Sequence, residues 1–326
     1  MDEWEPLLDR TVRLAREWLE GIDERRVFPA ESPDDLRRRF DPQLPEEGED
    51  PVTVIEDLAA AASPGLVASP GPRYFGFVIG GSVPASIAAD WLTSAWDQNA
   101  GLYVSSPASS VIEEIAAGWI LGLAGLPAGA GVGFSTGATM ANFTCLAAAR
   151  SAVLDRAGWD VEAKGLQGAP VIRVIVGGEV HATVTYALRL LGLGGSTAIR
   201  IPVDDQGAMR ADELRRVLAS DLSAPTIVAA QVGNVNSGAF DPLGAIADAV
   251  AEAGNAWLHV DGAFGFWAVA SPSLRHLVAG MERADSWTTD AHKWLNVPYD
   301  CGIAIVREPA WQERSMALTA AYLLAA

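Results

Sequence analysis

Lysine is almost absent from this chain, which otherwise meets its need for positive charge with arginine. Of 23 lysine and arginine residues, only Lys164 and Lys293 are lysines. A lysine amine can lose its proton and attack a carbonyl, whereas the arginine guanidinium stays protonated. Lys293 lies in the stretch DAHKWLNVPYDCG, positions 290–302. The residue type alone leaves two interpretations open: a nucleophilic amine or an ordinary surface lysine.

Other polar groups directly follow apolar stretches. Asp261 follows LHV in LHVDGAFG, where a carboxylate must find a partner or water. It could hold the proton of a ring nitrogen, or it could cap a helix or join a buried ion pair. His181 follows GGEV in the same way, and His292 adjoins Lys293. Each of these histidines could act chemically or could be a hydrogen-bonded structural residue.

The segment STGATMAN, positions 135–142, leads from an apolar stretch into a helical pattern. Its small residues would let backbone N–H groups at a helix start approach an anion. An ordinary strand–helix turn would have the same composition. The segment is neither a dinucleotide-binding GxGxxG nor a Walker loop, because GVGFSTG has a different spacing and no Gly-Lys pair.

The chain around these groups alternates, from residue 131 onward, short β-branched segments with helical patterns of about 10–15 residues. This alternation predicts an α/β fold with a mostly parallel sheet covered by helices on both faces. Residues 3–20 form a further amphipathic helical pattern. In such sheets the ligand lies beyond the carboxyl ends of the strands. The candidate loops are therefore Ser135–Thr139, Gly177–His181, Gly233–Ser237, Asp261–Ala263 and Asp290–Lys293.

Composition excludes several classes of partner. The net charge is −18 and the sequence pI is near 4.5, which argues against binding to nucleic acid or an anionic membrane. The sequence contains no CxxC or HExxH spacing, so no zinc site is predicted. The N-terminal MDEWEPLLDR lacks the apolar region of a signal peptide, and we expect a cytoplasmic protein.

Taken together, the amine, the anion site, the carboxylate and the imidazole are the groups that hold pyridoxal phosphate. At this point a resemblance becomes specific. HVDGAFG (259–265) followed by DAHKWLNVPYDCG (290–302) resembles the group II pyridoxal-phosphate-dependent amino-acid decarboxylases. That family includes aromatic-amino-acid, glutamate and 2,4-diaminobutyrate decarboxylases of fold type I. The similarity extends through GPRYFGFVIGG, WDQNAGLYVSSPASSVIEE and STGATMANFTCLAAAR.

The resemblance implies a role for each residue at the cofactor ring. Lys293 would be the Schiff-base lysine, and Asp261 would pair with the pyridine nitrogen. His181 would stack on one face of the ring near the substrate carboxylate, and Ala263 would pack on the other face. Asp290 stands where many relatives have asparagine. A carboxylate there would repel the phosphate unless it is itself paired.

The resemblance also implies residues around the phosphate and the substrate. Ala138 and Thr139 would bind the phosphate with help from His292. The other implied residues are Phe77, Val78 and Ile79 in the substrate pocket, Asn99 and Gly101 reaching the partner subunit's site, and Tyr322 as proton donor. Family members are homodimers, so a homodimer is expected here.

The expected organisation follows from the same resemblance. Residues 1–71 would form an N-terminal helical segment that makes dimer contacts in the family. Residues 72–326 would form the pyridoxal-phosphate-binding large domain, incomplete at its C-terminus, with the C-terminal small domain absent. The expected reaction is decarboxylation of an L-amino acid to an amine and carbon dioxide. The alternatives are an aldehyde synthase or aminotransferase of the same fold, or a truncated non-catalytic subunit.

Overall fold

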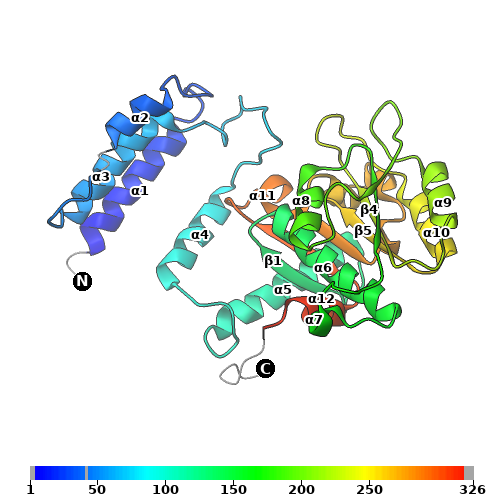
Figure 1. The fold of residues 1–326 in the computed structure, drawn as a ribbon. Helices are drawn as coiled ribbons and strands as arrows, with labels where there is room; N and C mark the ends of the chain where they lie inside the picture. Colours follow the sequence, from blue (N-terminus) through cyan, green and yellow to red (C-terminus); the bar gives the residue numbers. More distant parts are fainter. Residues whose placement is uncertain (1–3, 41–42, 319–326) are drawn as a thin grey trace. The chain divides into compact units, whose positions relative to one another are not determined.

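The structure, a computed structural model, describes residues 4–40 and 43–318 (Figure 1). It divides into two compact units, Met1–Gly81 and Ser82–Ala326. The expected division of the chain at residues 71 and 72, with a dimer-forming role for the first segment, stays a prediction. None of the helices in the described ranges has the length and apolar character needed to cross a bilayer.

The first unit is helical, as the pattern over residues 3–20 predicts. Its helices are α1 (Trp4–Glu20), α2 (Pro33–Arg39), α3 (Pro51–Ala62) and a 3-10 turn, η1 (Ser63–Gly65). Ser32 begins α2 with a capping box, because its hydroxyl accepts from the Asp35 N–H and the Asp35 carboxylate accepts from the Ser32 N–H. Arg10 on α1 forms an ion pair with Glu56 on α3, which ties the two helices together.

The second unit contains a seven-stranded mixed sheet in the order β1-β7-β6-β5-β4-β2-β3. The strands are β1 (Gly131–Ser135), β2 (Arg173–Gly177), β3 (Ile199–Ile201), β4 (Thr226–Gln231), β5 (Ala256–Asp261), β6 (Ser286–Asp290) and β7 (Gly302–Val306). Only β7 runs against its neighbours, β1 and β6. The other strands point the same way, so the predicted α/β class with a mostly parallel sheet is confirmed.

Helices cover both faces of this sheet (Figure 1). One face carries α5 (Pro107–Ala124), α9 (Ala211–Ala219) and α10 (Leu243–Ala253), and the other carries α6 (Ala138–Arg156), α8 (Ala182–Leu190) and α12 (Pro309–Met316). The unit also contains α4 (Pro84–Trp96) and two short helices, α7 (Val161–Lys164) and α11 (Ala291–Trp294). Three 3-10 turns lie between β5 and β6: η2 (Gly265–Ala270), η3 (Arg275–Val278) and η4 (Met281–Arg283).

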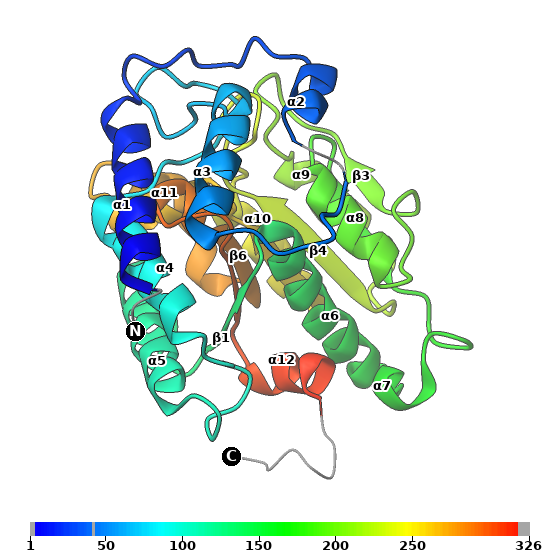
Figure 2. The same cartoon turned by 90° about the vertical axis from the view of Figure 1, so that its left-hand side faces the viewer.

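The core consists of two layers because successive side chains of a strand point to opposite faces. On β4, Ile227 and Ala229 pack with α6 and α8, whereas Val228 and Ala230 pack with α5, α9 and α10. Figure 2 shows α6 and α8 lying across the first of these faces. Both faces of the middle of β4 are therefore apolar, which explains the continuous apolar run IVAA within TIVAAQ.

Candidate active site

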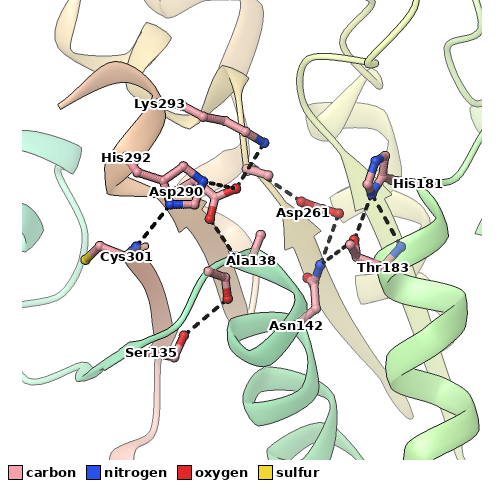
Figure 3. A network of polar contacts seen from close by, with 12 residues as sticks. Ser135, Ala138, Asn142, His181, Thr183, Asp261, Asp290, His292, Lys293 and Cys301 are labelled. Carbon is pink, nitrogen blue, oxygen red and sulfur yellow. Dashed lines mark hydrogen bonds and ion pairs between the residues drawn. The ribbon is translucent and has the colours of Figure 1, made fainter. Parts of the chain in front are cut away.

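The carboxyl ends of β1, β5 and β6 lie together with the start of α6 at one edge of the sheet (Figure 3). The direct contacts at this edge join residues that are far apart in the sequence. Ala138 at the start of α6 contacts Asp290 at the end of β6, and Asn142 on α6 contacts Asp261 at the end of β5. The sheet thus brings together four of the predicted loops, including the one that ends at His181 after β2.

Lys293 lies on the short helix α11 that directly follows β6. Its Nζ is 3.0 Å from Asp290 Oδ2, and its side chain is 20% exposed. Because Asp290 is the last residue of β6 and is buried, it fixes the direction of the amine three residues later. Lys293 is therefore a half-buried amine held by one ion pair rather than a freely solvated surface lysine.

The second oxygen of Asp290 occupies the start of α6. Ala138 N donates to Asp290 Oδ1 at 2.6 Å, so the first N–H of the helix already binds a negative charge. Gly137 precedes it with φ +113°, a conformation that favours glycine. The Asp290 carboxylate is thus paired on both oxygens, which is the condition under which an aspartate is tolerated at this position.

His292 is buried beside this ion pair. Its Nδ1 accepts from Cys301 N at 3.0 Å, and its Nε2 lies 3.6 Å from Asp290 Oδ2. Burial lowers the pKa of His292, and the nearby Asp290 charge opposes that shift. The ring also lies against Tyr299, with centroids 4.1 Å apart. These contacts hold a neutral imidazole next to the cradle formed by Gly137 and Ala138.

Asp261 ends β5 as a buried carboxylate with both oxygens bonded. Oδ1 accepts from Ala263 N at 3.1 Å, and Oδ2 accepts from Asn142 Nδ2 at 3.2 Å. Burial raises the pKa of Asp261, whereas these two donors and the positive groups of His181 and Lys293 lower it. The carboxylate therefore lies close enough to both predicted catalytic side chains to interact with their charges.

His181 begins α8 and is exposed. Its Nδ1 is 2.9 Å from Thr183 Oγ1 and accepts from Thr183 N at 3.3 Å, so the ring serves as the helix cap. Thr183 Oγ1 in turn accepts from Asn142 Nδ2 at 3.3 Å. His181 and Asp261 are thus joined through one amide on α6 (Figure 3). His181 can cap α8 and still take part in chemistry, because the cap uses Nδ1 and leaves Nε2 available.

Asn142, Thr183 and His259 were not predicted as site residues. Asn142 Oδ1 lies 2.8 Å from His259 Nε2, and both residues are fully buried. A sequence signal existed, since Asn142 lies in an Ala-, Cys- and Leu-rich helix and His259 lies in an apolar strand. A polar side chain in such surroundings must find a polar partner, but the partner itself depends on the packing of α6 against β5.

Among the remaining predicted residues, Ala263 takes part in this group of contacts. Ala263 follows Asp261 and accepts from Asp290 N at 3.3 Å, and Thr139 is the second residue of α6. Asn99 and Gly101 lie in the exposed loop after α4, where Asn99 Oδ1 accepts from Gly101 N at 3.1 Å. Phe77, Val78 and Ile79 belong to the first compact unit. Tyr322 lies outside the described residues.

The donor set fits pyridoxal phosphate. An amine for its aldehyde, a buried carboxylate for its ring nitrogen and an imidazole for its ring face are all present at one sheet edge. The start of α6 supplies the N–H groups that suit a phosphate, and Asp290 already uses the first of them. The carboxylate ends β5 and the lysine lies three residues past the end of the neighbouring parallel strand β6, so their separation is set by the sheet.

Comparisons with known proteins identify the family of the chain. The family described as "Pyridoxal-dependent decarboxylase conserved domain" matches residues 33–326. Tryptophan decarboxylase 1 of Oryza sativa subsp. japonica is 30% identical over 323 residues, covering 94% of this chain and 62% of that protein. Aromatic-L-amino-acid decarboxylase of Bacillus atrophaeus is 27% identical over 325 residues, covering 99% of this chain and 65% of that protein.

Solved structures share the fold. The structure of Oryza sativa TDC with PLP and tryptamine has a TM-score of 0.90 at 27% identity, covering 100% of this chain and 68% of that one. Mouse CSAD has a TM-score of 0.87 at 27% identity, covering 95% and 66%. The chain spans less than two thirds of the length of the first curated relatives. Because the family match runs from residue 33 to residue 326 and includes every strand of the sheet, the chain belongs to the pyridoxal-dependent decarboxylase family.

Proposed function

We propose that this chain binds pyridoxal phosphate through Lys293 and decarboxylates an L-amino acid to the corresponding amine. The observation that carries the proposal is the joint placement of Lys293, Asp261 and His181 around the start of α6. No other lysine could serve, because Lys164 lies exposed at the end of α7 over the Trp159 ring. Membership in the pyridoxal-dependent decarboxylase family supports the same reaction.

Pyridoxal phosphate supplies, when bound, an aldehyde that an amine can hold covalently and a ring that accepts the electrons released as carbon dioxide leaves. Lys293 would hold that aldehyde. The Asp261 carboxylate, with Asn142 and Ala263 donating to it, would accept a hydrogen bond from the protonated ring nitrogen. Ala138 and Thr139 would bind the phosphate, with His292 next to them.

His181 and Tyr322 would act on the substrate side. His181 caps α8 through Nδ1, so its Nε2 would face the substrate carboxylate and the ring. Tyr322 would return a proton to Cα after carbon dioxide has left. Phe77, Val78 and Ile79 would line the substrate pocket, and Asn99 with Gly101 would reach the site of a partner subunit.

The substrate class is an L-amino acid, and aromatic ones are the first to test. Among the relatives, Oryza sativa tryptophan decarboxylase 1 and the Manduca sexta aromatic-L-amino-acid decarboxylase carry such substrates in their names, at 30% identity each. The pocket residues around the substrate side chain decide which amino acid is accepted.

The proposed working state is a cytoplasmic homodimer. One face of α5 supports the dimer, since Ile112, Ile115, Trp119 and Leu123 recur at helical spacing and are 47–71% exposed. A contiguous apolar helix face of this kind is typical of a protein interface. The acidic net charge of −18 and the two free cysteines suit a reducing cytoplasm.

Borohydride reduction tests the cofactor site. The chain is mixed with pyridoxal phosphate, reduced with borohydride and digested, and the modified peptide is mapped. We expect the adduct on Lys293 and its complete loss in Lys293→Ala, with Lys164→Ala as the matched control that keeps it. An adduct on Lys164 alone, or equal losses in the two variants, would refute the assignment.

Product analysis tests the reaction. The fold also accommodates Rhodiola rosea 4-hydroxyphenylacetaldehyde synthase, with a TM-score of 0.86 at 24% identity, so the fold alone does not choose between the two reactions. We expect an amine and carbon dioxide in equal amounts from each accepted amino acid. An aldehyde with ammonia would instead indicate an aldehyde synthase, and a keto acid would indicate an aminotransferase.

A further inference from the structure

A continuous line of buried polar groups runs between the sheet and α6 and ends at Asp261. Trp257 Nε1 donates to Ser286 Oγ at 2.9 Å, and Ser286 Oγ lies 2.9 Å from His259 Nδ1. His259 Nε2 lies 2.8 Å from Asn142 Oδ1, and Asn142 Nδ2 donates to Asp261 Oδ2 at 3.2 Å. Trp257, His259 and Asp261 share one face of β5 because they alternate along it.

Every hydrogen bond in this line can point in only one direction when Asp261 is ionised. A carboxylate only accepts, so the Asn142 amide must turn its NH₂ toward Asp261 and its oxygen toward His259. The amide oxygen only accepts, so His259 must carry its proton on Nε2. His259 Nδ1 then accepts from the Ser286 hydroxyl, whose oxygen accepts from the Trp257 indole N–H.

The reverse arrangement is unfavourable at the Asp261 end. If the Asn142 amide turned over, its oxygen would face the Asp261 carboxylate and its NH₂ would face His259 Nε2. At the other end, the Trp257 indole N–H only donates, and Ser286 Oγ accepts that bond while its own hydrogen is free to point at His259 Nδ1. Since His259 is 0% exposed, no water competes for its ring nitrogens. The Asp261 carboxylate therefore sets the direction of the whole line.

We propose that His259 is a positioning residue that fixes the orientation of the Asn142 amide and, through it, the Asp261 carboxylate. The amide also donates to Thr183 Oγ1, which binds the His181 cap. One buried histidine thus orders the two groups that contact opposite parts of the cofactor, an assignment that rests on the proposed function. His259 itself touches neither cofactor nor substrate; it acts through Asn142.

The tautomer of His259 is the direct test, and it needs no cofactor. Long-range ¹H–¹⁵N correlation spectra of the full chain labelled with [¹⁵N]histidine distinguish the four rings. The His259 signals are assigned by their loss in His259→Gln. We expect a neutral ring with the proton on Nε2. A proton on Nδ1, or rapid exchange between the two nitrogens, would overturn the proposal.

A matched pair of variants tests the consequence for the site. In His259→Gln the side-chain nitrogen reaches the position of Nε2 and can still donate to Asn142, whereas in His259→Asn it reaches only the position of Nδ1. We expect pyridoxal phosphate to bind His259→Gln within about threefold of the native chain and His259→Asn at least about tenfold more weakly, which is about 1.4 kcal/mol. Equal affinities for the two variants would contradict a positioning role.

The two tests separate this inference from the proposed function. If the native chain shows no Lys293 adduct while His259 carries its proton on Nε2, the cofactor assignment fails and the hydrogen-bond line stands. If the adduct forms while the two variants bind the cofactor equally, the cofactor assignment stands and the positioning role fails. Should His259→Asn not fold, the spectrum of the native chain still decides the direction of the line.

Discussion

We predict that the free energy of unfolding falls in acid, and the size of this effect follows from one buried side chain, His259. Burial lowers the pKa of His259 from its ordinary 6.5 to about 3. Between these values the unfolded chain binds a proton that the folded chain does not, so stability falls as the pH falls. The contribution of His259 is fully present above about pH 6.5 and is lost progressively below it. At pH 5 the loss is about 2 kcal/mol, from about 1.5 pH units at 1.36 kcal/mol each.

The assay compares the native chain with His259→Gln by urea unfolding at pH 7.5 and pH 5.0. We expect the free energy of unfolding of the native chain to fall by about 2 kcal/mol more over this interval than that of the variant. The carboxyl pKa values of Asp241, Asp261 and Asp285, raised by burial, act in the opposite sense, since acid relieves their cost. They are present in both chains and cancel in the difference.

The exposed His276 provides the control, because its replacement by glutamine changes the same atoms without opening a buried site. We expect His276→Gln to follow the native chain at both pH values. The same pH dependence for the native chain and His259→Gln would refute the reasoning, since it would mean that the buried imidazole is protonated in the fold at little cost.

Two further substitutions test the geometry around the start of α6. A Cβ on Gly302 would overlap the Gly137 carbonyl carbon, so Gly302→Ala should displace the cradle, weaken cofactor binding and cost about 1–3 kcal/mol of unfolding free energy. The control Gly118→Ala, where a Cβ would meet no atom within 4 Å, should leave cofactor affinity unchanged and should not destabilise the fold, because alanine is favoured over glycine in a helix. Unchanged cofactor affinity in Gly302→Ala would argue against this edge as the phosphate site. Asp290→Asn keeps an acceptor for Ala138 but removes a negative charge beside the phosphate. Titrations should therefore show about tenfold tighter binding of pyridoxal phosphate, which is about 1.4 kcal/mol. Pyridoxal, which lacks the phosphate, should bind no more tightly. Equal tightening for both ligands would show that the charge acts on Lys293 instead.

The parts of this site that could be predicted from the sequence are those set by local pattern. An aspartate directly after LHV and a lysine soon after SWTTD lie at strand ends whatever the order of the strands, because parallel strands share one carboxyl edge. The period of the strands and helices likewise predicts the two-faced sheet. Lys293 could be singled out because the chain has so few lysines.

The parts that could not be predicted depend on contacts between distant segments. Asn142 and His259 are 117 positions apart, and Ala138 and Asp290 are 152 positions apart. Which polar side chain faces which is decided by the packing of α6 on β5 and β6, and periodicity does not encode this. The pairing of Asp290 with both Lys293 and Ala138 could not be predicted for the same reason.

The place of β7 in the sheet also affects how the protein is made. β1 has β7 as its sheet neighbour, and Ser135 at the end of β1 contacts Gly302, which lies 167 positions later. At about 5–20 residues per second, a ribosome needs roughly 10–30 seconds to extend the chain from one to the other. During that time β1 lacks its strand partner, and the cradle at the start of α6 has no support from Gly302. Nascent chains in this interval would expose an apolar strand edge that chaperones recognise, so the cofactor site is among the last parts of the fold to form.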